Sequence, residues 1–343
     1  MLVDDTLREG LQSPGMSFKI EEKLKLAELI SKTGIKTAIV SYPSAHSSEI
    51  IVTKEILKRK YFSEVFALGR TIIEDIDIIY DSGANISLHL PFEIKNSEKI
   101  FEAIKYASKK GKLLEVGLVN ITEYNETDLI KLAKKIEENG ADRIQIADTL
   151  GSATPKFIYK IIKGLKEQVS IPINVHCHND VGLAVTNAIS AIDAGANFVD
   201  TTIFGIGERN GIVDTITLST LLMKEGYSIR IDTDALLKAY EYLESLIYEK
   251  IGNISFLNNF PIYGKNTRIS TAGTHAAFEK VFKKNEYSIN VYTGRNMIKN
   301  ILQNNNIKID EQKLATLVKK IKDVVVETGK ALNENDIINM VRD

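Results

Sequence analysis

The sequence has little of what several classes of protein require. With one cysteine in 343 residues, it cannot form an internal disulfide framework. No apolar run approaches the ~20 residues of a membrane span, and the start, MLVDDTLREG, does not have the pattern of a signal peptide. The 44 Lys and Arg residues nearly cancel the 45 Asp and Glu residues, so the net charge indicates no nucleic acid and no membrane as partner. We therefore expect a soluble, cytoplasmic, globular protein.

Short apolar segments alternate with amphipathic stretches from the first residue to about 225. Glycine recurs just before the apolar segments, where a helix C-cap and a short loop belong. An open, doubly wound sheet would usually carry a Gly-rich phosphate turn after its first strand, and the sequence has none there. The pattern therefore predicts an α/β fold, a closed (β/α)8 TIM barrel over residues 1–227. The expected strands are Leu2–Asp5, Thr37–Ser41, Val65–Leu68, Ile86–Leu90, Leu114–Val119, Arg143–Ala147, Ile173–His176 and Phe198–Thr202.

The alternation stops in the remainder of the chain. TDALLKAYEYLESLIYEKI and EQKLATLVKKIKDVVVETGKAL have helical periodicity, and no strand pattern lies between them. The segment SFLNNFPIYGKNTRISTAGTH is polar and irregular. We expect residues 228–343 to form a small helical C-terminal subdomain, with no additional regulatory domain.

The segment NVHCHNDVGLAV holds two of the five histidines. Because side chains alternate along a strand, His176 and His178 are expected on one side and Cys177 on the other. The pair ends the seventh expected strand, at the end of a barrel where active sites lie. Two imidazoles on one face can bind one divalent ion. A pair of hydrogen-bonded structural histidines is the alternative.

The first expected strand ends in DDTLREGLQSPG, which puts Asp4, Arg8 and Glu9 at the same end of the barrel. Arg8 is a permanent cation suited to stabilising an enolate or alkoxide, and Glu9 offers an oxygen ligand. Taken alone, the segment is more typical of a helix N-cap with a solvated cluster of charges.

Two further side chains are expected at this end. His89 ends the fourth expected strand, and Arg70 follows the third in FALGR. His89 could bind substrate or simply pack. Arg70 could hold a substrate carboxylate or be a cation at the start of a helix.

Two more segments complete a recognisable set: ADTLGSATP after the sixth expected strand and TTIFGIGERNGI after the eighth. Together with DDTLREG and HCHNDVGLA, they resemble the acyl-CoA Claisen-condensing metal barrels. That family includes isopropylmalate, homocitrate, citramalate and Re-type citrate synthases, and the hydroxymethylglutaryl-CoA lyases are its relatives. The GERNGI spelling, together with glutamate at position 9, is closest to homocitrate synthase.

The resemblance implies a metal-dependent acyltransferase. It would condense acetyl-CoA, or another acyl-CoA, with a 2-oxo acid to give a 2-hydroxy-dicarboxylic or tricarboxylic acid. Glu9, His176 and His178 would hold a divalent cation, namely magnesium, manganese or zinc, and Arg8 would stabilise negative charge. The residues expected to bind substrate are Arg8, Gln12, Arg70, His89 and Thr149.

The segment STAGTH resembles a further part of the synthases and makes His275 the candidate acid/base. In the synthases this part of one chain covers the barrel of a twofold partner, so we expect a homodimer in which His275 acts in trans. Leu11, Ile39 and Ser270 depart from the family pattern, and so does VNITEYNETD after the fifth strand, which leaves the acceptor open. The alternatives are a lyase that runs the reverse cleavage and a non-catalytic barrel that binds a 2-oxo acid.

Overall fold

The computed structural model describes residues 1–91, 97–252, 260, 263, 269–270, 286–287, 289, 293–328 and 331–342. Contacts between residues divide the chain into two compact units, Met1–Asn253 and Ile254–Asp343. Each unit has its own core.

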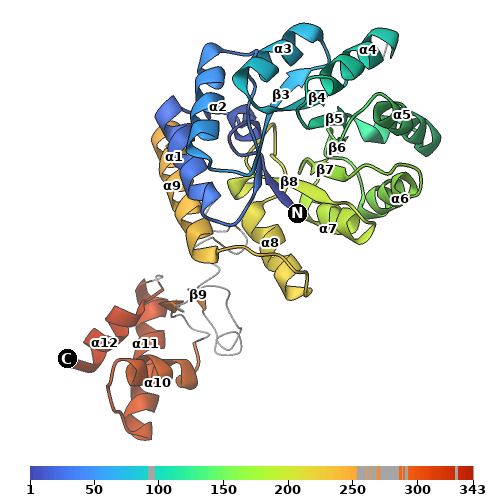
Figure 1. Ribbon diagram of the computed structural model, residues 1–343. Coiled ribbons are helices and arrows are strands. Elements are labelled where there is room, and N and C mark those ends of the chain that lie inside the picture. Colours follow the sequence, from blue (N-terminus) through green and yellow to red (C-terminus); the bar gives the residue numbers. More distant parts are fainter. Residues whose placement is uncertain are drawn as a thin grey trace. The chain divides into compact units, whose positions relative to one another are not determined.

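The first unit is a closed barrel of eight parallel strands, as predicted (Figure 1). Each strand pairs with its neighbour in sequence, and β1 closes on β8 with Val3 opposite Asp200. The expected strands are confirmed, with ends that differ by at most two residues. The strands are β1 Leu2–Asp4, β2 Thr37–Ser41, β3 Glu64–Arg70, β4 Asn85–His89, β5 Leu114–Leu118, β6 Arg143–Asp148, β7 Ile173–Cys177 and β8 Phe198–Thr201.

Helices surround the strands on the outside of the barrel (Figure 1). Gly83 ends α3 with φ 90°, the left-handed conformation that glycine adopts without strain, and the chain then enters β4. The helices are α1 Ile20–Ser31, α2 Ser47–Arg59, α3 Ile73–Ser82, α4 Ser97–Ser108, α5 Glu126–Glu138, α6 Pro155–Lys166, α7 Ala184–Asp193 and α8 Thr215–Lys224.

One further helix, α9 (Thr233–Ile251), belongs with the barrel. It packs against α1 and buries an apolar face that includes Leu236 and Leu243. The boundary expected after residue 227 assigned this helix to the C-terminal subdomain. The structure instead divides the chain after Asn253, because the face of α9 is covered by the barrel's own first helix.

The second unit is mainly helical in the residues that the structure describes. Its helices are α10 Arg295–Asn304, α11 Glu311–Thr328 and α12 Glu334–Arg342, and a short parallel pair joins β9 (Ile269–Ser270) to β10 (Glu286–Tyr287). One apolar cluster forms its core: Ile289, Met297, Ile298, Ile301, Leu302, Leu314, Leu317, Ile321 and Ile337. No described helix in either unit combines the length and apolar composition needed to cross a membrane.

The interior of the barrel has two chemically different sides. The apolar side consists of five buried residues on β1, β2, β3 and β8: Val3, Ile39, Phe66, Leu68 and Phe198. The polar side includes buried residues on β5 to β8, among them Glu115, Arg143, Gln145, Asn174 and Asp200. Hydrogen bonds join Asn174 to Glu115 and Gln145 to Asp200. Since each bond links strands that are not neighbours, these side chains meet inside the barrel.

Candidate active site

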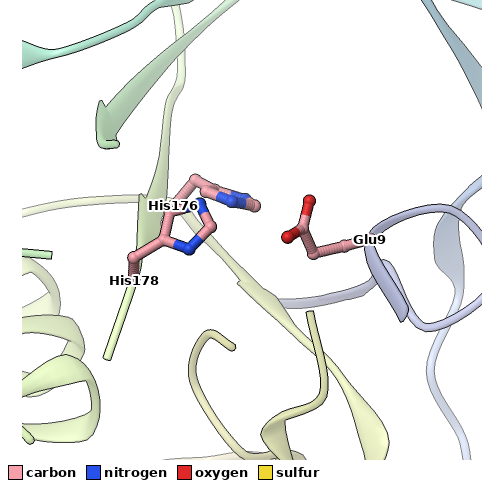
Figure 2. A group of neighbouring side chains, drawn as sticks. All are labelled: Glu9, His176 and His178. Carbon is pink, nitrogen blue, oxygen red and sulfur yellow. The ribbon is translucent and has the colours of Figure 1, made fainter. Parts of the chain in front are cut away.

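The three expected metal ligands lie together where the strands end. Glu9 begins the short helix η1 (Glu9–Gln12) just after β1, His176 lies in β7, and His178 follows that strand. All three are buried, and their ligand atoms lie within 4.8 Å of one another. The carboxylate of Glu9 faces the two imidazole rings, whose centroids are 5.0 Å apart (Figure 2). The strand alternation therefore brings both rings to one side, as the sequence predicted.

The carboxylate of Glu9 is held in its ionised form. Burial alone would raise its pKa, but the Arg8 guanidinium, followed by His176, lowers the pKa of Glu9 to about 2. Its Oε1 accepts a hydrogen bond of 2.8 Å from the backbone N–H of Glu208. A Cβ atom at Gly207 would lie 2.7 Å from that same oxygen, so the loop approaches this closely because residue 207 is glycine.

His178 is a neutral ligand candidate with an unused nitrogen. Burial, followed by the nearby His176, lowers the pKa of His178 to about 4. Its Nδ1 is buried and has no hydrogen-bond partner in the described part of the chain. Buried polar atoms are normally paired. An unpartnered imidazole beside an ionised carboxylate fits a divalent cation, which needs deprotonated ligands.

A second buried group, Asp5, His176 and Asp200, also has ligand atoms within 4.8 Å of one another. Here the atoms are already engaged. His176 Nδ1 lies 2.9 Å from a carboxylate oxygen of Asp200. Both carboxylate oxygens of Asp5 accept hydrogen bonds from the guanidinium of Arg8. We interpret this group as hydrogen-bonded support for a metal ligand, of the kind that often fixes the orientation of a ligating histidine.

Arg8 lies in the middle of this cluster. Its Nε donates to Asp5 at 3.0 Å, its Nη2 also donates to Asp5, and its Nη1 donates to Glu9 and, at 3.2 Å, to Gln12. A guanidinium has five N–H groups. The fifth, on Nη2, has no acceptor among the described residues, so it is free for a ligand.

Gln12 and Thr149 lie at the same end of the barrel and are held by their neighbours. Gln12 Nε2 donates to Glu208 at 3.4 Å. The hydroxyl of Thr149 accepts a hydrogen bond of 2.8 Å from the backbone N–H of Asn120. Whether either residue binds substrate stays a prediction.

Arg209 connects three loops at this end. Its guanidinium donates to both carboxylate oxygens of Asp180, each at 2.8 Å, and to the carbonyl of Thr149 at 2.7 Å. The loops that follow β6, β7 and β8 are therefore tied together by one side chain.

Two of the expected substrate-binding residues have protein partners. Arg70 is exposed and forms a two-point ion pair with Asp75 of α3, at 3.0 and 2.8 Å. His89 is half-buried, and its Nε2 lies 2.9 Å from Gln145 Oε1. Burial, followed by the charge of Arg8, lowers the pKa of His89 to about 3. His275, the expected acid/base, lies outside the described residues.

The motif analysis missed the residues that support the site, above all Gln145, Asn174 and Asp200. A signal for them exists in the sequence. In INVHC every second residue is polar within an otherwise apolar strand, and RIQIAD begins with the same alternation at Arg143 and Gln145. Strand alternation puts such residues on one face, and in a closed barrel that face is the interior.

Comparisons with known proteins agree with this picture. A family described as HMGL-like matches residues 1–243. The 2-isopropylmalate synthase of Methanocaldococcus jannaschii is 30% identical over 100% of this chain and 71% of its own length. The homocitrate synthase of Pyrococcus horikoshii is 31% identical over 94% of both chains. Among solved structures, an HMG-CoA lyase from Bacillus subtilis superposes with a TM-score of 0.65 at 20% identity, covering 74% of this chain and 93% of its own, which supports the fold alone.

Proposed function

This chain belongs to the HMGL-like family, and we propose that it condenses acetyl-CoA, or another acyl-CoA, with a 2-oxo acid. The product is a 2-hydroxy-dicarboxylic or tricarboxylic acid. The observation that carries the proposal is the convergence of Glu9, His176 and His178 beside Arg8, in a chain that is similar over nearly its whole length to proteins named as synthases. Those relatives include homocitrate and isopropylmalate synthases at nearly equal identity, so the acceptor acid is left open.

We propose that Glu9, His176 and His178 hold magnesium, manganese or zinc. When bound, such a cation supplies Lewis acidity toward the keto and carboxylate oxygens of a 2-oxo acid. The free N–H of Arg8 stabilises negative charge on the oxygen of the former keto group, in a buried setting where such donors are strong. Thr149, Gln12, Arg70 and His89 are the candidates for orienting the substrates.

The proton transfers are assigned to His275. It removes a proton from the acyl methyl group, and the carbon left with the electron pair adds to the keto carbon. The new oxyanion then takes up a proton, and water cleaves the thioester to release the CoA thiol and a carboxylate. Thioester hydrolysis makes the overall condensation favourable.

We further propose a cytoplasmic homodimer in which His275 acts in the partner's barrel. Inactive Glu9→Ala and His275→Ala chains can be mixed, dissociated and reassociated. Half of the dimers are then mixed, and each mixed dimer holds one intact site, so activity returns to about a quarter of wild type. No recovery, despite mass-spectrometric proof of subunit exchange, would exclude action in trans.

The reaction itself is tested with metal-loaded protein, acetyl-CoA and a panel of 2-oxo acids that differ in side-chain length and charge. Condensation releases the CoA thiol only when the right acid is present, and mass spectrometry identifies the product. Cleavage of hydroxymethylglutaryl-CoA without any condensation would indicate a lyase. Tight binding of a 2-oxo acid without turnover would indicate a non-catalytic barrel.

A further inference from the structure

Three N–H groups converge on the carboxylate of Asp200 inside the barrel. His176 Nδ1 lies 2.9 Å away, Gln145 Nε2 lies 2.8 Å away, and Asn174 Nδ2 lies 2.8 Å away. Asp200 is fully buried. A carboxylate that receives three donors acts purely as an acceptor, so each neighbour must turn a hydrogen toward it.

The orientation of the Gln145 amide, which Asp200 determines, also determines which nitrogen of His89 carries the proton. Because the amide nitrogen of Gln145 faces Asp200, the amide oxygen faces His89 Nε2 at 2.9 Å. An amide oxygen has no hydrogen to give, so the proton of the neutral imidazole must be on Nε2. His89 Nδ1 then carries a lone pair, and no described residue bonds to it.

The contact between His89 and Gln145 has a steric condition. A Cβ atom at Gly117 would lie 2.7 Å from His89 Cδ2 and 2.9 Å from Gln145 Oε1. Only glycine at position 117 lets the imidazole and the amide meet in this arrangement.

We propose that Asp200 is a positioning residue that fixes the tautomers of two histidines. It holds the proton of His176 on Nδ1, which leaves Nε2 for the metal, and through Gln145 it holds the proton of His89 on Nε2. His89 therefore offers substrate a hydrogen-bond acceptor. Its Nδ1 accepts a hydrogen bond from an N–H or O–H group of the acyl-CoA, or from the hydroxyl of the product. It does not bind a substrate carboxylate. The His176 half rests on the proposed metal site, whereas the His89 half needs neither metal nor substrate.

The Asp200→Asn variant tests both halves, since it keeps the shape and leaves one oxygen for three donors. The side-chain amide of Gln145 should rotate by half a turn, so that its oxygen accepts a hydrogen bond from the new NH2 group of residue 200. Its nitrogen should then face His89. Nitrogen-15 NMR of histidine-labelled, metal-free protein distinguishes a ring nitrogen that bears a proton from one that does not. We expect the proton of His89 on Nε2 in the wild type and on Nδ1 in the variant. Zinc affinity measured by calorimetry should fall about 10–100-fold, the usual cost of losing such support.

Two variants separate the halves. Gln145→Leu removes the His89 contact and one donor to Asp200 but leaves His176 on Asp200, so we expect a mixture of His89 tautomers with zinc affinity unchanged. This variant suffices if Asp200→Asn does not fold. Glu115→Gln is the matched control, because it makes the same carboxylate-to-amide change in the same network without touching a histidine. Both readouts should keep their wild-type values in it.

The proposal is overturned if His89 carries its proton on Nδ1 in the wild type, or if Glu115→Gln shifts the tautomer as much as Asp200→Asn does. It is also overturned if Gln145→Leu weakens zinc binding as strongly as Asp200→Asn. The His89 tautomer could shift as expected in a protein that condenses no 2-oxo acid. That result would contradict the proposed function and leave this inference intact.

Discussion

The two sides of the barrel interior are built from the same kind of strand and opposite kinds of side chain. On the apolar side, Phe66 and its neighbours are removed from water, which stabilises the fold directly. On the polar side, Glu115 and Asp200 are also buried, and their desolvation is offset by hydrogen bonds from Asn174 and other donors. The Arg143 guanidinium, 3.7 Å from a carboxylate oxygen of Glu115, adds an ion pair. The difference indicates a division of labour, in which one side holds the barrel together and the other orients the candidate site.

The largest expected effect is on activity and comes from His178→Ala. Removing a ligand should cost the several kcal/mol that a Lewis acid supplies, or roughly a 10³-fold fall in kcat/KM. Stability of the metal-free protein should fall by only about 1 kcal/mol, since the imidazole loses its packing on the His176 ring but its Nδ1 has no hydrogen bond to lose among the described residues. Enzyme assays with and without chelator, together with urea unfolding, measure both. Full activity in this variant would show that the metal lies elsewhere.

A complementary effect is expected on the apolar side, where Phe66→Ala should lower the free energy of unfolding by about 3–5 kcal/mol. Phe66 is only 1% exposed and lies under the Arg143 guanidinium, 5.0 Å from the ring centroid. Zinc affinity of the folded variant should be unchanged. Leu113→Ala, at a side chain that is 40% exposed, is the control and should cost far less. If Phe66→Ala abolished metal binding in protein that remains folded, the two sides would not be independent.

The burial of carboxylates on the polar side should make the free energy of unfolding depend on pH. Burial, followed by the charge of Asp200, raises the pKa of Glu115 from about 4.5 to about 7. The folded protein thus binds this proton more tightly than the unfolded chain, and the resulting stability is lost as pH rises through about 7. Glu115→Gln carries no such charge, so its stability relative to wild type should improve between pH 5 and 8, by at most a few kcal/mol at about 1.4 kcal/mol per pKa unit. Urea unfolding of both proteins across this range gives the difference directly, and a difference independent of pH would contradict the assignment.

The smallest effect is expected from Cys177→Ala. Cys177 is buried, and strand alternation turns it away from His176 and His178. The loss of one small buried group should cost roughly 1 kcal/mol of stability. Calorimetry should find zinc affinity unchanged, and weaker binding would place the thiol at the metal.

The sequence predicted best what depends on local pattern. The eight strands followed from apolar segments of the right length, and strand alternation placed His176 and His178 on one side. Glu9 was added as their partner by the resemblance to the metal barrels. The ion pair of Arg70 with Asp75 was not predicted, because it depends on how the turn after β3 bends back toward α3.

The support of the site was missed for a different reason. Gln145 and Asp200 lie on strands that are not neighbours, so their contact exists only once the barrel has closed. Likewise, the apolar face of α9 is visible in the sequence, but its partner α1 lies some two hundred residues away and no local pattern identifies it.

The hydrogen bonds that Arg209 makes to two neighbouring loops limit which loops can be exchanged in order to change acceptor specificity. Since this one guanidinium holds Asp180 and the carbonyl of Thr149, a loop grafted after β6, β7 or β8 would disturb the other two. The segment after β5 is held more simply, with the Asn120 N–H on the Thr149 hydroxyl as its described link to the next loop. It is also one of the places where the chain departs from the family pattern. Within this segment Asn120 and Ile121 are buried and the Asn125 side chain caps α5, so libraries aimed at a new 2-oxo acid should begin with residues 122–124.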